Sequence, residues 1–162
     1  MKNLTDQLYT SVVRNELKKA KNLIAQGGEI NVFLDRTGQY MIHSPTQDGN
    51  TEMLQLLISH GADLNVKTKP GFTACHLAAM SNNLEALKLL IENGADKDIR
   101  DPYGNTLLTT AVASFDGDDS IVKYLLDLGM DPLAENNRGN NLLNGLDMPR
   151  KDPIRHLFEK WL

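Results

Sequence analysis

The residues best suited to chemistry in this chain are an adjacent cysteine and histidine, Cys75 and His76. A thiol beside an imidazole is the pairing that provides a nucleophile and its general base in cysteine hydrolases. Neighbouring residues on a helix point in different directions, however, so adjacency in sequence does not bring the two side chains together. We therefore predict that the chain is not an enzyme. An enzyme or a small-molecule receptor using a groove near Cys75 and His76 is the alternative hypothesis.

Two other patterns contain potential metal ligands. His43 and His76 recur at the same position of a 33-residue repeat, so they should lie about one helix spacing, roughly 10 Å, apart. A single metal ion holds its ligands at about 2 Å and cannot bind both. The segment Asp116-Gly117-Asp118-Asp119 is similar to the start of a calcium loop, but the twelve-residue pattern ending in a glutamate is missing. We predict no metal and no cofactor.

The elements that hold these residues are repeats. Gly38, Gly71 and Gly104 follow one another at intervals of 33 residues, and Gly61 and Gly94 do the same. A period in this range is typical of a solenoid. The segments that follow the first three glycines also match, namely Tyr40-Met41-Ile42-His43, Thr73-Ala74-Cys75-His76 and Thr106-Leu107-Leu108-Thr109. Each copy is consistent with a polar turn followed by two antiparallel helices, the second ending at a glycine.

These residues resemble the ankyrin repeat, whose pattern runs Gly-x-Thr-Pro-Leu-His-x-Ala-Ala, then a leucine run, then Gly-Ala-Asp-x-Asn. The resemblance covers nearly the whole chain. It implies an all-α ankyrin-repeat solenoid of stacked helix-turn-helix units with short turn or hairpin loops. We expect one domain over residues 1–162, comprising an N-terminal cap repeat (1–33), three internal repeats (34–66, 67–99 and 100–134) and a C-terminal cap repeat (135–162).

The chain departs from the family pattern in two places. Pro45-Thr46 stands where two alanines are usual, and a proline inside a short helix removes a hydrogen bond and clashes one turn back. We expect the first helix of that repeat to be distorted. The third repeat carries two extra residues around Phe115-Asp116, and this longer segment is either a tolerated loop insertion or a contact point for a partner.

Basic residues gather in the first unit, at Arg14, Lys18, Lys19 and Lys21. Such a group either meets an acidic partner or forms a solvated face. Because the terminal repeat of a solenoid needs a polar outer surface, we expect the second.

Composition limits the class of protein. With 162 residues, 41% hydrophobic and 23% charged, the chain has the content of one globular domain. No apolar run approaches the roughly 18 residues of a membrane span, and residues 1–7 lack the apolar core of a secretory signal. A formal charge of −4 with interspersed signs argues against general binding to nucleic acid or membranes. The single cysteine suits a reducing compartment, so we expect a cytoplasmic protein that is a monomer when unbound.

The family resemblance implies a partner that docks on the concave face, formed by the turn tips and the exposed side of each first helix. The candidate partner-binding residues there are Arg36, Lys69, Phe72, Met80, Tyr103, Ser114, Phe115, Asp116 and Arg138. Aromatic residues, Met and Arg are the types enriched in interface cores. With no second domain evident, we predict a free-standing module that binds another protein stoichiometrically, as an inhibitor (an immunity-type or regulatory protein) or as an adaptor.

Overall fold

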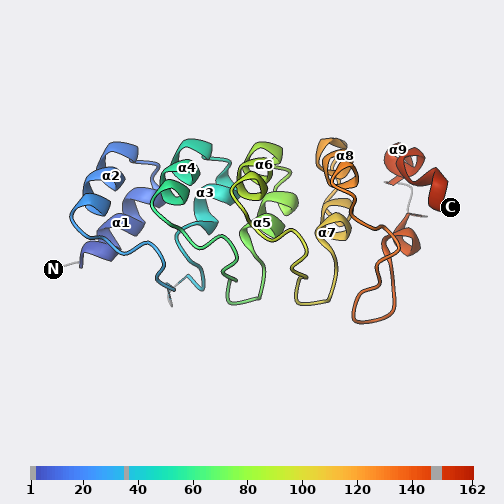
Figure 1. The fold of residues 1–162 in the computed structure, drawn as a ribbon, viewed down its shortest axis with the longest axis horizontal. Helices are drawn as coiled ribbons and strands as arrows, with labels where there is room; N and C mark the ends of the chain where they lie inside the picture. Colours follow the sequence, from blue (N-terminus) through green and yellow to red (C-terminus); the bar gives the residue numbers. More distant parts are fainter. Residues whose placement is uncertain (1–2, 35–36, 147–150) are drawn as a thin grey trace.

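The computed structural model describes residues 3–34, 37–146 and 151–162, and over these ranges every regular element is a helix. Paired helices stack side by side in two layers, with α1, α3, α5 and α7 in one layer and α2, α4, α6 and α8 in the other (Figure 1). The bounds are α1 Leu4–Val13, α2 Leu17–Ala25, α3 His43–Asp48, α4 Thr51–Ser59, α5 Ala74–Met80, α6 Leu84–Glu92, α7 Leu107–Ala113 and α8 Ser120–Asp127. None of the helices in the described ranges is long and apolar enough to cross a membrane.

Each helix of the second layer, the outer helices, ends at a glycine in the left-handed region. The φ angles are 93° at Gly27, 82° at Gly61, 94° at Gly94 and 77° at Gly129. Side chains disfavour this conformation, so glycine is the residue that allows the chain to reverse there. The predicted glycine caps are confirmed.

The inner helices, those of the first layer, begin at threonines in two repeats. The Thr106 side chain accepts a hydrogen bond of 3.1 Å from the backbone N–H of Thr109. In the preceding repeat, the Thr73 hydroxyl lies 2.8 Å from His76 Nδ1, within a capping box. These side chains satisfy groups that the first helical turn leaves unpaired, as the sequence predicted.

Helix α3 is the exception. Helix α5 begins two residues before His76, whereas α3 begins only at the equivalent His43. Tyr40 takes the place of the capping threonine, and Pro45 has no N–H to donate one turn back. The predicted distortion is confirmed, and it takes the form of a late start to the helix.

The core lies between the two layers and between successive repeats. One cluster of buried apolar side chains occupies the first two helix pairs, and a second runs from there to the C-terminal helices. On α5, the small residues Ala74, Ala78 and Ala79 are buried, and this helix packs directly against α3 and α7. Small side chains permit that close approach, so each repeat covers the apolar face of its neighbour.

Asparagines bridge successive repeats on the loops that follow the outer helices. Asn31 Oδ1 accepts a hydrogen bond of 2.8 Å from the backbone N–H of Asp63, and its Nδ2 donates to the Gly61 carbonyl at 2.8 Å. Asn65 Oδ1 accepts from the N–H of Asp96 at 2.9 Å. At the next equivalent position stands Asp98, whose carboxylate lies 3.0 Å from Lys97 Nζ. The asparagine bridge therefore joins the first unit to the second and the second to the third, whereas an aspartate stands at this position before the fourth unit.

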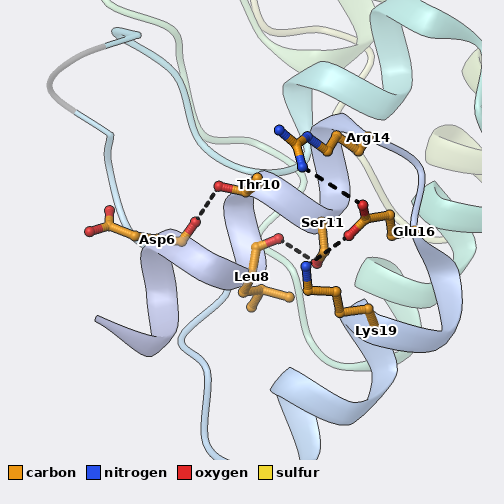
Figure 2. A network of polar contacts seen from close by, with 7 residues as sticks. All are labelled: Asp6, Leu8, Thr10, Ser11, Arg14, Glu16 and Lys19. Carbon is orange, nitrogen blue, oxygen red and sulfur yellow. Dashed lines mark hydrogen bonds and ion pairs between the residues drawn. The ribbon is translucent and has the colours of Figure 1, made fainter. Parts of the chain in front are cut away.

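The polar side chains of the first unit pair locally. Figure 2 shows Glu16 between Arg14 and Lys19, with closest N···O distances of 4.0 and 3.0 Å. The Ser11 hydroxyl donates to the Leu8 carbonyl at 2.7 Å and is buried within α1. Arg14, Lys18, Lys19 and Lys21 are all exposed, in agreement with a solvated terminal face. Surface ion pairs of this kind add about 0–1 kcal/mol to stability.

The C-terminal end covers the stack with short helices. A 3-10 turn at Leu142–Gly145 is followed by α9, Asp152–Arg155, and by a 3-10 helix at His156–Trp161. Helix α9 starts at Asp152, with Pro153 in its first turn and Lys151 at the N-cap position. Ile154 and Phe158 are buried, whereas Leu157 and Trp161 are only half-buried. The segment therefore presents an apolar side to the third repeat.

Candidate functional site

Before α5, α7 and the 3-10 turn at Leu142–Gly145, the chain forms a tight loop that projects from the stack (Figure 1). We call residues 68–72, 101–105 and 136–140 the finger loops. Each is closed by one bond of the same type, from the first residue's N–H to the carbonyl four residues on, at 2.9, 3.1 and 2.8 Å. In the second finger loop, the Asp101 carboxylate accepts further bonds from the N–H groups of Tyr103 (2.8 Å) and Asn105 (2.9 Å). Asp101 is buried by this role, so the loop has a fixed shape.

The finger loops touch one another. The Asn137 N–H donates to the Tyr103 carbonyl at 3.1 Å, which joins the third finger loop to the second, and the Lys69 N–H of the first finger loop donates to the Gly38 carbonyl of the preceding repeat at 2.6 Å. A Cβ added at Gly71 would lie 3.0 Å from Pro102 Cγ, so the first and second finger loops are also in close contact. The exposed tips form one continuous fingertip row, which we define as Lys69, Pro70, Pro102, Tyr103, Asn137 and Arg138.

Tyr103 is the most exposed large apolar side chain in the described residues, at 61%. A rigid aromatic side chain held in water by a fixed loop loses little entropy on binding, which is why tyrosine is common at the centre of interfaces. Phe72, by contrast, is half-buried, and its ring meets the His76 ring edge-on at 6.2 Å between centroids. Phe72 therefore supports the start of α5 as well as the surface.

A second set of exposed side chains lies at the far ends of the inner helices. Met80, the last residue of α5, is 46% exposed, and Val13, the last residue of α1, is 44% exposed. The sequence analysis did not identify Val13 as a surface residue. The first and second units are offset by 34 residues and not by 33, so Val13 does not align with Met80 under a constant period of 33. The signal lay in the left-handed residues after these helices, Asn15, Gly49 and Asn82, of which Asn15 and Asn82 are visible as matching asparagines in the sequence.

The extra residues of the third repeat are tied to their neighbours. The Asp116 carboxylate accepts a hydrogen bond of 3.1 Å from Asn82 Nδ2, across the repeat boundary. Phe115 is half-buried, and Lys151 Nζ lies 5.5 Å from the centre of its ring. The buried Lys151 also donates to the Val112 carbonyl. This segment thus joins the C-terminal segment to the third repeat, whatever contacts it makes with a partner.

The predicted partner-binding residues therefore fall on two edges of one face. Lys69, Phe72, Tyr103 and Arg138 lie on or beside the finger loops, whereas Met80, Ser114, Phe115 and Asp116 lie at the helix ends. The seven residues of α5 separate the two edges by about 10 Å, at 1.5 Å per residue. Arg36 lies outside the described residues. The assignment of these residues to a partner stays a prediction.

Cys75 and His76 are enclosed, at 2% and 1% exposure. Burial raises the pKa of the Cys75 thiol to about 12, so the nucleophilic thiolate is not formed near neutral pH. Burial also lowers the pKa of His76 to about 4, so its imidazole is neutral. His76 Nδ1 accepts from the Thr73 N–H at 3.3 Å, and His43 Nδ1 accepts from the Tyr40 N–H at 3.0 Å. Both histidines have structural roles, and the burial of the pair is evidence against a reactive groove around it.

One shallow groove lies on the outer layer. It has a volume of about 710 Å³ and runs along α4, with contributions from α2 and α6; its lining includes Leu17, Lys21, Gln55, Leu56, His60 and Leu89. No cluster of three or more His, Cys, Asp or Glu side chains able to hold a metal ion occurs among the described residues. The groove is on the opposite layer from the finger loops and inner helices.

Comparison with known proteins agrees with this architecture. The profile of a family described as ankyrin repeats (three copies) matches residues 8–101 and 49–136. A 79-residue stretch is 33% identical to the Notch-regulated ankyrin repeat-containing protein of Xenopus laevis, covering 46% of this chain and 69% of that protein.

Two longer proteins also match over part of their length. The 2-5A-dependent ribonuclease of Mus musculus is 29% identical over 73 residues, 45% of this chain and 10% of the ribonuclease. The neurogenic locus Notch protein of Drosophila melanogaster is 33% identical over 57 residues, 35% of this chain and 2% of that protein. The ankyrin-repeat profile covers residues 8–136, and the chain therefore belongs to the ankyrin-repeat family.

Proposed function

We propose that this chain binds another protein through the concave face bounded by the fingertip row and the ends of the inner helices. Ankyrin repeats are generally protein–protein interaction modules. The observation that carries the proposal is the exposure of Tyr103 (61%) and Met80 (46%) at opposite edges of the same face, in a stack whose leucines are largely buried. Aromatic and methionine side chains held in this way are typical of interface cores.

The binding would be stoichiometric, as an inhibitor or an adaptor. A single concave contact that covers the working surface of its partner is sufficient for an inhibitor, including an immunity-type or regulatory protein. An adaptor needs a second surface that stays free when the first is occupied. The groove along α4 on the outer layer is the place where we would expect that second contact.

We propose that the chain works as a monomer in the cytoplasm until it meets its partner. A single cysteine held at 2% exposure has no need of an oxidising compartment. The burial and protonation of the Cys75 thiol disfavour an enzyme that uses this residue as its nucleophile.

The proposal is tested by affinity capture from a lysate of the native organism. Wild-type protein is used beside a Met80→Ala/Tyr103→Ala variant and a Leu133→Ala control, since Leu133 is 45% exposed but lies on neither edge. Each truncation on the face should cost more than about 1 kcal/mol of binding. We expect a stoichiometric partner that is retained by the wild type and the control and lost by the double variant. Equal retention by all three would place the contact elsewhere.

A further inference from the structure

The fingertip row places positive charge on both sides of Tyr103. Lys69 and Arg138 are exposed tip residues of the flanking finger loops, and Lys67 is exposed just before the first of them. Within the described residues, none of these three cations forms an ion pair. The three charges are therefore available to a partner.

The acidic groups near the row do not cancel this charge. Asp101 is buried and its carboxylate accepts bonds from Tyr103 and Asn105. Glu135 is exposed at the base of the last finger loop, so Asp101 and Glu135 together bring two negative charges against the three cations. Arg100 adds a further cation at the base, where its guanidinium donates to the Gly104 and Glu135 carbonyls at 2.8 and 2.7 Å. The finger side of the concave face is therefore net positive.

The opposite edge of the same face is acidic. Asp48 is exposed at the end of α3, and Asp116 and Asp118 are exposed on the loop that follows α7. Asp119, in contrast, is compensated by Lys123, at 2.9 Å. The concave face is thus polarised, positive along the fingertip row and negative along the helix ends.

We infer that the partner contacts the fingertip row through an acidic segment that carries an aromatic or apolar side chain placed against Tyr103. This inference rests on the proposed function and specifies the chemistry of the partner. Lys69 and Arg138 belong to repeats two apart, so they lie roughly 20 Å from each other at a helix spacing of about 10 Å. An extended segment of about seven residues, at about 3.3 Å per residue, spans that distance.

Complementary charge of this kind sets orientation and accelerates association. Lys69 and Arg138 would each pair with a carboxylate of the segment, while Tyr103 between them supplies the apolar contact. The acidic opposite edge excludes the reversed placement, in which the carboxylates of the segment would face Asp48 and Asp116. The polarity of the face therefore dictates which way a partner lies on it.

A protein segment fits this face better than a longer polyanion does. A DNA duplex, about 20 Å wide, would reach across the 10 Å of α5 and meet the acidic edge. The chain also carries a net charge of −4, which opposes a polyanion at long range. A second copy of this chain, offering its own acidic edge to the fingertip row, is the other occupant that the test must separate.

The test begins with a display selection of random 12-residue peptides against the folded wild-type chain. Selected peptides are synthesised and their affinities measured by fluorescence anisotropy against three proteins. These are the wild type, Lys69→Glu/Arg138→Glu, and Lys18→Glu/Lys21→Glu. The last is a matched control that makes the same change of charge on α2, away from the fingertip row. Circular dichroism of each variant verifies folding.

We expect the selected peptides to be rich in Asp and Glu around an aromatic or apolar residue. Their binding should weaken at least about tenfold in Lys69→Glu/Arg138→Glu, change less than twofold in the control, and weaken as salt rises. Neutral or basic peptides, the absence of any selected peptide, or equal loss in both charge variants would overturn the inference.

Two further probes address the other occupants. A 20-base-pair DNA duplex that binds as tightly as the selected peptides would assign the fingertip row to nucleic acid. Sedimentation of a concentration-dependent dimer that Lys69→Glu/Arg138→Glu abolishes would assign it to a second copy. Peptides that lack acidic residues but still need Tyr103 would refute this inference and leave the proposed function standing. Binding unaffected by Met80→Ala/Tyr103→Ala would refute both.

Discussion

Helices α3 and α5 occupy equivalent places in successive repeats, yet only α5 has a complete first turn. Helix α5 has seven residues and starts at a threonine cap, whereas α3 has six, starts later and contains Pro45. Behind them, the outer helices α4 and α6 are both nine residues long, and their matched leucines, Leu57 and Leu90, are both 0% exposed. An inner helix can thus start two residues late while the stack keeps its register, because contacts between repeats hold the outer layer and the finger loops in place.

The largest expected effect comes from the matched leucines. Leu57→Ala and Leu90→Ala should each lower the free energy of unfolding by roughly 2–5 kcal/mol, since both remove a fully buried side chain and leave a cavity. If stacking dominates over the quality of the inner helix, the two losses should agree within about 1 kcal/mol. Urea denaturation measures both. A much smaller loss at Leu57 would mean that the repeat containing Pro45 is already loosely packed.

Moving the proline from α3 to the equivalent position of α5 should reverse the difference in stability between the two helices. Ala78→Pro places a proline at the α5 position equivalent to Pro45 and should cost about 3 kcal/mol, because it removes a helical hydrogen bond and clashes one turn back. Pro45→Ala should give a modest gain in stability and in helical circular dichroism. The account would be contradicted if Ala78→Pro were neutral, because α5 would then tolerate a proline as well as α3 does.

The two buried histidines, His43 and His76, make the stability of the fold depend on pH. Burial lowers the pKa of His76 to about 4, from an ordinary value of 6.5. The unfolded chain therefore binds the proton first, so stability falls as pH drops from 6.5 towards 4, by up to about 1.4 kcal/mol per pH unit from this group. Burial also lowers the pKa of His43, but its Nε2 lies 3.1 Å from the Val66 carbonyl, which raises the pKa in part.

The change in stability between pH 7 and 4.5 should therefore depend more on His76 than on His43. His76→Gln should flatten the profile more than His43→Gln does. Equal flattening by the two variants, or a wild-type profile that rises as pH falls, would contradict the assignment of neutral, buried imidazoles.

The smallest expected effect concerns the asparagine bridge. Asp98 stands where Asn31 and Asn65 join successive repeats, and it lines a cavity of about 260 Å³ with Arg100, Met130 and Asp131. Asp98→Asn should restore an amide that can both donate and accept there, with a gain of about 0.5–1.5 kcal/mol. Thermal unfolding against Asn65→Ala, which should lose a similar amount, provides the comparison. A loss in Asp98→Asn would show that the pair with Lys97 matters more.

Much of the fold could be predicted because the residues that end a helix or form a turn recur at the same interval as the repeats. The glycines at 33-residue intervals marked the ends of the outer helices, and Pro45 marked the weak inner helix. The burial of Lys151 against Phe115 could not be predicted, since it depends on how the C-terminal segment folds back onto the third repeat. The candidate residues were found by register, at the turn tips and on the first helices. Their division into two edges follows from the length of α5, which separates Phe72 from Met80.

The most direct test of the central claim is amide hydrogen exchange on this chain with and without its captured partner. The account predicts slower exchange at residues 68–72, 101–105 and 136–140 and at the ends of α5 and α7, with α2, α4 and α6 unchanged. Protection confined to the outer helices would contradict it and would move the binding site to the groove along α4.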